Sequence, residues 1–280
     1  MYLNITTTSL RGAAEAIVFK MAPDKIFLLG AHEYQKQFNV GPHHSMNAEL
    51  ITCYHFLILL APNNKREEEE LYKVVDKIKL PGTRIIAIIV PVSVFGQWLQ
   101  KGNILAHNAW HTKRLIYDAG KAILSAPGAY DIDLVYKNVQ VETTRWIETA
   151  IHLKNSVEYF KKARQYQLGA FILHQAAEQS LMAIIRLSTG YRAGTHNLWR
   201  LLRYAQVFSG LPFGMFNSSP GKEKALLKLL QSAYIGGRYK NDFELTEHQF
   251  LMLEEGIESL LNNIKNAITK LHPGSSLTAE

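Results

Sequence analysis

The sequence has a single cysteine, Cys53, among its 280 residues. One cysteine forms neither an internal disulfide nor a cysteine-rich zinc site, so the composition fits a reducing compartment and predicts a cytoplasmic protein. The sequence also lacks an uninterrupted apolar run of about 18 residues, the length that predicts a membrane span. Its first ten residues lack a basic segment followed by an apolar one. We therefore expect neither a signal peptide nor a membrane partner.

The sequence contains no dense block of lysine and arginine, although its formal net charge is +7. A positive balance of this kind favours acidic partners, including nucleotides and nucleic acid. Hydrophobic residues make up 47% and charged residues 20%, which is typical of globular proteins. The length accommodates two modest domains.

The first half of the chain alternates short apolar runs with helical stretches, which predicts an α/β domain over residues 1–125. Two of the runs are almost continuously apolar, as expected for strands that are covered on both faces. The expected strands are Lys25–Gly30, Tyr54–Leu60 and Arg84–Val90. The expected helices run from a Ser9 cap to Met21, over Lys65–Ile78, and over Val92–Tyr117 with a break near Gly102.

The second half has a helical pattern almost throughout, which predicts an all-α bundle over residues 141–272. Residues 126–140 are expected to form a linker, in which Asp131–Tyr136 is read as a short strand or irregular chain. Gly190 and the pair Gly236-Gly237 are expected to end helices, and Thr195, Ser219 and Thr246 to begin them. The expected helices cover 141–165, 167–189, 196–208, 220–235 and 247–271, followed by a disordered tail at 273–280.

Several short motifs with fixed spacing lie on these predicted helices. They are His174-Gln175-Ala176-Ala177-Glu178, Gly190-Tyr191, Thr195-His196-Asn197-Leu198, Leu201-Leu202, Ala233-Tyr234 and Arg238-Tyr239. In this combination the segment resembles the HEPN domain family, and the resemblance covers residues 140–272.

The resemblance implies a helical bundle that commonly forms homodimers and binds nucleotides or RNA. Some HEPN domains are RNases, often toxins of toxin–antitoxin pairs, marked by an arginine followed after four to six residues by a histidine. Here the residues at those spacings from Arg238 are Phe243, Glu244 and Leu245. The RNase motif is therefore incomplete, although His174 or His196 could replace the missing histidine.

HEPN domains often accompany minimal nucleotidyltransferase domains, and the first half resembles a degenerate one. Such domains carry Gly-Ser after the first strand and Asp-x-Asp on the next, where the carboxylates hold Mg²⁺. Here Gly30-Ala31 stands at the first position and Cys53-Tyr54-His55 at the second. Because both carboxylates are missing, we predict a non-catalytic domain that needs neither Mg²⁺ nor another cofactor.

The candidate nucleotide- or phosphate-binding residues are His174, Glu178, His196, Arg238 and Tyr239. His174 and Glu178 are four apart and share one helix face. They either contact phosphate or form a buried polar pair that fixes the packing of the bundle. Arg238 either clamps phosphate in a bidentate manner or caps the carbonyls of its own helix.

His107 and His111 have the spacing of two zinc ligands on a helix, but the sequence shows no third ligand beside them. We therefore predict surface or packing histidines there, and no metal site. Three functions remain open. The chain is a HEPN-type nucleotide- or RNA-binding protein, a metal-independent RNase with a rearranged active site, or a protein-interaction module without catalysis.

Overall fold

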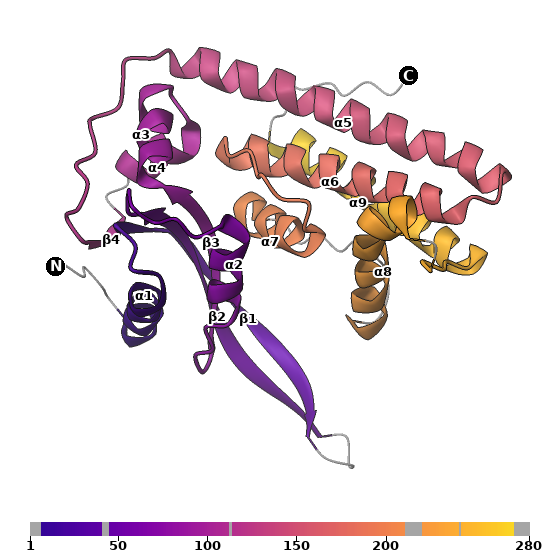
Figure 1. Ribbon diagram of the computed structural model, residues 1–280, viewed down its shortest axis with the longest axis horizontal. Helices are drawn as coiled ribbons and strands as arrows, with labels where there is room; N and C mark the ends of the chain where they lie inside the picture. The colour runs from indigo at the N-terminus through magenta and orange to yellow at the C-terminus, as the bar shows by residue number, and fades with distance from the viewer. Residues whose placement is uncertain (1–6, 41–44, 112–113, 211–219, 241, 272–280) are drawn as a thin grey trace. The chain divides into compact units, whose positions relative to one another are not determined.

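The computed structural model describes residues 7–40, 45–111, 114–210, 220–240 and 242–271 (Figure 1). The chain divides into two compact units, Met1–Ile132 and Asp133–Glu280. The first combines a small mixed sheet with helices, and the second is helical. The expected tail at 273–280 and the Ser219 cap lie outside the described residues.

The sheet of the first unit has the strand order β3–β2–β1–β4. β1 (Lys25–Val40) and β2 (Ser45–Leu60) form a long antiparallel ribbon, and β3 (Thr83–Pro91) runs parallel to β2. The three predicted strands are confirmed, but β1 and β2 extend well beyond the predicted bounds. Their outer halves are exposed at positions such as Glu33 and Leu50. These positions lack the apolar run by which a buried strand is recognised.

The fourth strand, β4 (Leu115–Asp118), shows that the predicted helix over Val92–Tyr117 was wrong at its end. α3 (Val92–Gln100) and α4 (Ile104–His111) occupy the earlier part and separate at Gly102, whose φ is +70°. β4 pairs antiparallel with the first residues of β1. A four-residue apolar segment cannot be distinguished from a helix end by periodicity, so only the sheet edge that it meets decides its structure.

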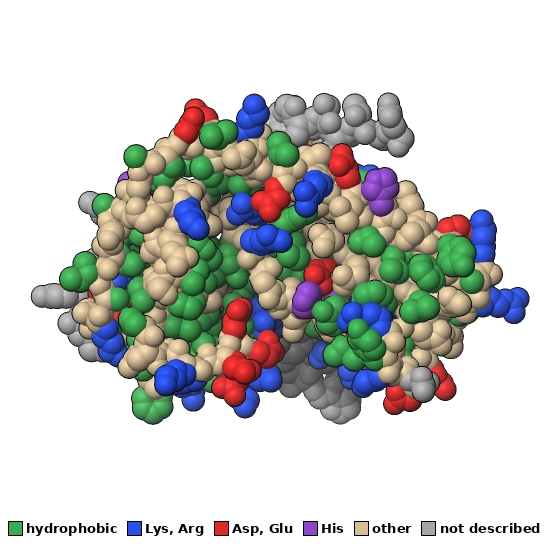
Figure 2. Space-filling model, turned by 45° about the horizontal axis from the view of Figure 1, so that its top comes forward, with side chains coloured by type: hydrophobic (Ala, Val, Ile, Leu, Met, Phe, Trp, Pro, Cys, Tyr) green, Lys and Arg blue, Asp and Glu red, His purple; other side chains and the backbone are tan. Residues whose placement is uncertain are grey.

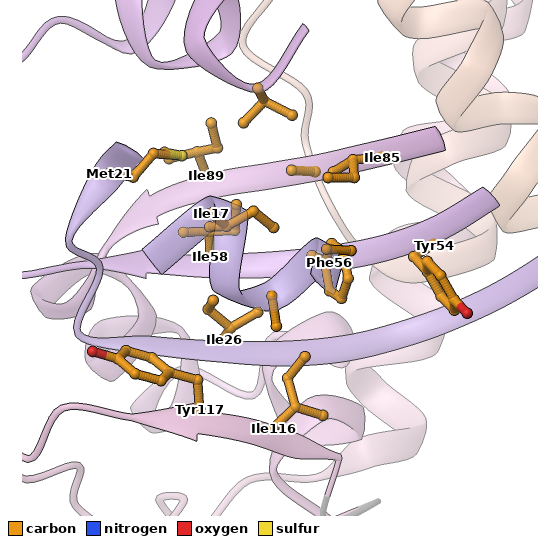
Figure 3. Packing of buried hydrophobic residues seen from close by; sticks show 14 of the residues in the cluster. Ile17, Met21, Ile26, Tyr54, Phe56, Ile58, Ile85, Ile89, Ile116 and Tyr117 are labelled. Carbon is orange, nitrogen blue, oxygen red and sulfur yellow. The ribbon is translucent and has the colours of Figure 1, made fainter. Parts of the chain in front are cut away.

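One face of the sheet packs against α1 (Thr8–Met21) and α2 (Glu68–Asp76). Figure 3 shows Ile17 and Met21 of α1 over Ile58 and Ile89 of the strands. α1 is capped by Thr7, whose Oγ1 accepts a hydrogen bond from the Leu10 amide, and not by the predicted Ser9.

The opposite face of the sheet is also buried. Cys53, His55, Leu57 and Leu59 alternate along β2 on this side, and Phe27 of β1 stacks on Phe95 of α3 with ring centroids 5.5 Å apart. Burial on both faces accounts for the nearly continuous apolar runs of β2 and β3.

The second unit consists of α5 (Ile132–Lys162), α6 (Tyr166–Thr189), α7 (Leu198–Ser209), α8 (Pro220–Tyr239) and α9 (Glu247–Leu271). α6 contacts α7, α8 and α9 and forms the centre of the bundle. α5 is tied to α6 by the Glu142–Arg186 ion pair and to α9 by the Lys161–Glu254 ion pair. Within the described residues, α6 is also the one helix long and apolar enough to cross a membrane. That is weak evidence for a span, because 67% of its apolar window is buried inside the protein.

Three helix ends differ from the sequence prediction. α5 begins at Ile132, inside the expected linker, although its buried positions start only at Val139. α7 is capped by Asn197 rather than Thr195, since the Asn197 side chain accepts from the Arg200 amide. α8 passes through Gly236-Gly237 and ends at Tyr239.

Two predicted helix ends are confirmed. Gly190 ends α6 in the left-handed conformation with φ 71°. Thr246 and Gln249 exchange hydrogen bonds at the start of α9, which is a capping box.

Candidate functional site

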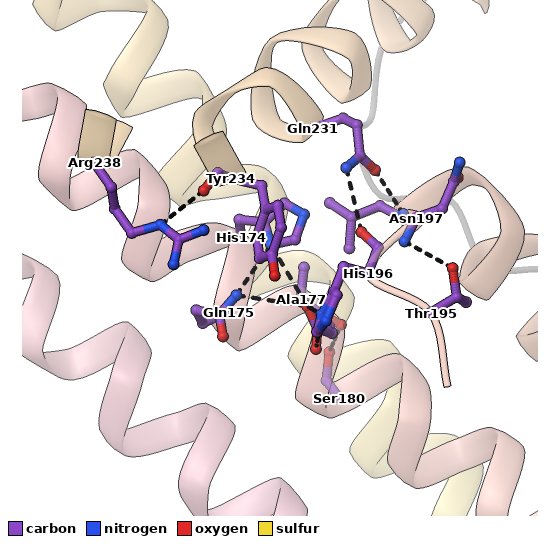
Figure 4. Close-up of polar contacts among 12 residues, drawn as sticks. His174, Gln175, Ala177, Ser180, Thr195, His196, Asn197, Gln231, Tyr234 and Arg238 are labelled. Atoms are coloured by element: carbon purple, nitrogen blue, oxygen red, sulfur yellow. Dashed lines mark hydrogen bonds and ion pairs between the residues drawn. The ribbon is translucent and has the colours of Figure 1, made fainter. Parts of the chain in front are cut away.

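Polar side chains from three segments of the helical unit meet in one cluster (Figure 4). α6 supplies His174 and Glu178, the segment before α7 supplies His196, and α8 supplies Tyr234 and Arg238. Four of the five residues that the sequence singled out therefore lie together. The fifth, Tyr239, is at the end of α8 and contacts Arg238.

His196 and Glu178 form a hydrogen-bonded pair. The Nδ1 atom of His196 lies 3.0 Å from both carboxylate oxygens of Glu178. Burial raises the pKa of the Glu178 carboxyl, although the hydrogen bond from His196 acts in the opposite direction. The Glu178 side chain is 6% exposed, whereas that of His196 is 59% exposed. A buried carboxylate at Nδ1 fixes the ring orientation and leaves Nε2, which has no protein partner in the described part of the chain, for a ligand.

The start of α7 is held against α8 by Gln231, which keeps His196 in place. The Gln231 side chain donates to the His196 carbonyl oxygen at 3.2 Å and accepts from the Leu198 amide at 2.7 Å. Both bonds are to the backbone, so the position of His196 is fixed independently of its side-chain contacts.

His174 is completely buried beneath this pair. Burial, and then the positive charges of His196 and Arg238, lower the pKa of His174 to about 4, so its ring is neutral at pH 7. Its Nδ1 lies 3.3 Å from the Gln175 side-chain nitrogen and 3.8 Å from Glu178. Its Nε2 is buried without a hydrogen-bond partner among the described residues. This is the buried polar pair that the sequence analysis gave as one alternative.

The ring of Tyr234 links the two histidines. Its centroid lies 4.9 Å from that of His174 and 4.8 Å from that of His196, and it is nearly parallel to the latter with an interplanar angle of 19°. Sequence reasoning placed Tyr234 in the family pattern but did not assign it to the site. Its four-residue spacing from Arg238, which puts both on one face of α8, was the signal that could have found it.

Arg238 is exposed and partly held by its own helix. Its Nε donates to the Tyr234 carbonyl oxygen at 2.9 Å, so the predicted contact with helix carbonyls exists. Its guanidinium carbon lies 4.4 Å from the Phe171 ring centroid, 4.6 Å from that of Tyr234 and 4.8 Å from that of Tyr239. No acceptor for its Nη groups is found in the described part of the chain. The aromatic contacts leave the positive charge available to a ligand, because no carboxylate among the described residues forms an ion pair with it.

The two glycines that were expected to end α8 have a different role. A Cβ on Gly237 would lie 2.5 Å from the carbonyl oxygen of Gln167 on α6 and 3.1 Å from the Cβ of Phe171. A Cβ on Gly236 would lie 2.7 Å from the Phe243 ring. Glycine at 237 is therefore required for the close approach of α8 to α6, and glycine at 236 makes room for the Phe243 ring. That approach brings Tyr234 and Arg238 over Phe171 and His174.

Comparison with known families identifies the helical unit. Residues 143–271 match the sequence model of the HEPN domain. Comparison with curated proteins gives no match to the chain. HEPN domains often bind RNA and form dimers, and many are RNases, so the match indicates a function related to nucleotides or RNA. The C-terminal half of this chain, residues 143–271, belongs to the HEPN domain family.

Proposed function

We propose that the helical unit binds the phosphate groups of a nucleotide or of single-stranded RNA at the cluster of Arg238 and His196. The observation that carries the proposal is that an exposed guanidinium and an exposed, carboxylate-oriented imidazole both pack on the ring of Tyr234. Arginine and histidine in this arrangement match the charge and the hydrogen-bonding capacity of a phosphate.

Each residue of the cluster has a distinct part in this proposal. The Nη groups of Arg238 clamp phosphate oxygens, and the Nε2 of His196 contacts a further oxygen. Glu178 orients His196 from beneath. Tyr239 is 74% exposed and offers a ring on which a base can stack. His174 is too deeply buried to touch a ligand, so it acts as a positioning residue for Tyr234.

The mixed charge on one face of the protein fits a small ligand. On the face drawn in Figure 2, lysine and arginine side chains are interspersed with aspartate and glutamate. A long nucleic acid is usually bound by a continuous basic surface. A local phosphate site suits a nucleotide or a short single strand better.

We also propose that the helical unit forms a homodimer and that the protein is cytoplasmic.

For the N-terminal unit we propose a nucleotidyltransferase-like domain without transferase activity. Gly30 on β1 pairs with His55 on β2. The two positions that correspond to Gly-Ser and Asp-x-Asp are therefore adjacent in space, although Gly30 lies within β1 and not after it. Because Cys53 and His55 replace the carboxylates, the oxygen ligands that Mg²⁺ requires are missing from those positions.

The test is binding of a fluorescently labelled short single-stranded RNA by anisotropy, with ribonucleotides as competitors. Arg238→Ala is expected to weaken binding about ten- to hundredfold, the loss typical of a hydrogen bond to a charged group. Arg192→Ala is the matched control, because Arg192 is also exposed and lies over an aromatic ring, that of Trp146, at 5.5 Å. Equal affinities of the two variants would contradict the proposed site. Failure of the unmodified protein to bind would favour the protein-interaction module.

A second candidate function, metal-independent RNA cleavage, is favoured by the orientation of His196. A histidine held through Nδ1 by a carboxylate is the arrangement of a general acid or base. Cleavage of single-stranded RNA in the presence of a chelator, lost in His196→Ala, Arg238→Ala or His174→Ala, would establish this function. Intact RNA at high protein concentration would exclude it.

A further inference from the structure

A second cluster of chemically reactive side chains lies in the N-terminal unit, on the two strands of the ribbon. His32 of β1 and Cys53 and His55 of β2 each direct a donor atom toward the others, and the three donor atoms all lie within 4.8 Å of one another. The Nδ1 of His32 is 2.9 Å from the Nε2 of His55. Cys53 and His55 are buried, and His32 is exposed.

An irregularity in β1 places His32 on this side of the sheet. Cys53 and His55 are two apart on β2 and therefore share one face. The register between β1 and β2 shifts between Leu28 and Gly30, so that Gly30 opposes His55 and His32 opposes Cys53. Without that bulge the alternation along β1 would turn His32 to the opposite face.

The bulge is held by specific contacts. The guanidinium of Arg114 donates to the carbonyl oxygen of Leu29 at 2.8 Å, and the Leu28 amide donates to the Arg114 carbonyl oxygen at 2.9 Å. Gly30 adds room above the histidine, because a Cβ at this position would lie 3.4 Å from the Nδ1 of His55. The strand is thus shaped to bring the three donors together.

The donor set and its spacing fit a zinc ion. Tetrahedral zinc with Zn–N bonds of about 2.0–2.1 Å and a Zn–S bond of about 2.3 Å separates two nitrogens by about 3.3 Å and nitrogen from sulfur by about 3.6 Å. An ion between His32 and His55 would require their nitrogens to separate by about 0.4 Å. Because His32 is exposed, that movement needs no rearrangement of the core.

We propose that His32, Cys53 and His55 form a zinc-binding site, with the Cys53 thiolate and two neutral imidazoles as protein ligands and a fourth position open to solvent. Imidazole and thiolate suit zinc, whereas Mg²⁺ and Ca²⁺ require oxygen ligands. Binding displaces the thiol proton of Cys53, and the proton between the two imidazoles moves to the other ring nitrogen of the imidazole that carried it.

Arg84 of β3 lies next to this cluster and adds a positive charge beside it. It is the register partner of Cys53, and its guanidinium donates to the Tyr34 hydroxyl at 3.3 Å, while the Tyr34 and His32 rings stack with centroids 5.9 Å apart.

The test is a competition titration of zinc against a chromophoric chelator, with the full-length protein first stripped of metal. We expect about one equivalent of zinc to bind, as the three-ligand set implies. His32→Ala and Cys53→Ser should each weaken binding at least about tenfold. His107→Ala/His111→Ala is the matched control, because it removes another neighbouring histidine pair, with ring centroids 4.2 Å apart, from the same unit.

Cobalt provides a direct view of the ligands. Cobalt bound at this site should give a thiolate-to-metal charge-transfer band that Cys53→Ser abolishes and the control variant retains. His32 is exposed, so His32→Ala tests the site even if a variant at a buried position does not fold. Absence of zinc binding, or unchanged affinity in both His32→Ala and Cys53→Ser, would overturn the proposal. Neither result depends on whether the helical unit binds RNA.

Discussion

Replacing Gly237 by alanine tests whether the close contact between α8 and α6 builds the candidate site. The added methyl group would lie 2.5 Å from the Gln167 carbonyl oxygen, which belongs to helix backbone and cannot rotate away. Reaching 3.0 Å, below which such contacts are essentially never observed, requires the helices to separate by about 0.5 Å. Because Arg238 follows immediately, that shift moves its guanidinium away from the Phe171 ring.

The size of the effect follows from two opposing contributions. Overpacking of this kind costs about 1–3 kcal/mol, and replacing glycine by alanine inside a helix returns about 1 kcal/mol. We therefore expect a net loss of about 0–2 kcal/mol and weaker RNA binding. The same substitution at Gly221, also in α8, introduces a methyl group with no atom within 4 Å. It should be neutral or stabilise the helix by up to about 1 kcal/mol.

Thermal unfolding followed by far-ultraviolet circular dichroism measures the difference between the two variants. Each kcal/mol corresponds to roughly 2–4 °C for a protein of this size, so Gly237→Ala should melt several degrees below Gly221→Ala. RNA anisotropy on the same samples measures the site. If Gly237→Ala melts with Gly221→Ala and binds RNA normally, the helix contact does not position Arg238, and the reasoning fails.

Two further predictions concern buried ionisable side chains. The pKa of His174 is lowered from 6.5 to about 4, so the unfolded chain binds more protons than the folded protein between these pH values. The contribution of His174 to stability is therefore complete above pH 6.5 and falls by up to about 3 kcal/mol as the pH approaches 4. Urea unfolding across this range should show a shallower pH dependence in His174→Gln than in the unmodified protein, and identical slopes would contradict the prediction. Lys25 is buried between Asp24, at 3.2 Å, and Asp118, at 2.7 Å. Lys25→Met should destabilise the N-terminal unit by about 3–5 kcal/mol, because the buried Asp24 loses its ion-pair partner. A loss below about 1 kcal/mol in denaturant unfolding would contradict this reasoning.

The parts of the fold that the sequence predicts are those set by local chemistry. Continuous apolar runs identified the inner halves of β2 and β3, and the caps at Gly190 and Thr246 followed from side-chain and backbone preferences of single residues. The outer halves of β1 and β2 were missed, since an exposed ribbon has no apolar face to display. β4 was missed because its four residues become a strand only by pairing with the edge of β1.

Gly236 and Gly237 show why residue preferences alone do not locate the end of a helix. Gly236-Gly237 predicts a helix end if only chain flexibility is considered, yet α8 continues through both residues. The course of α8 here depends on a contact between segments that are far apart in the sequence. Glycine at 237 permits α8 to approach the backbone of α6 at Gln167. Helix packing can offset the unfavourable propensity of two glycines when it buries enough surface around them.

The candidate site depends on the same contact, which is why its residues could be selected from the sequence but not assembled from it. The four-residue spacing of His174 and Glu178 gave one face of α6. The partner of Glu178, however, is His196 from another segment, and the ring that links His174 and His196 belongs to Tyr234 on α8. The zinc ligands pose the same problem in a sheet, because the bulge after Leu28 decides which face His32 occupies. In each unit, one backbone feature that the sequence does not make obvious aligns the reactive side chains. It is the contact at Gly237 in the helical unit and the bulge of β1 in the sheet. Substitutions at either place should weaken RNA or zinc binding, although no residue that contacts RNA or zinc is replaced.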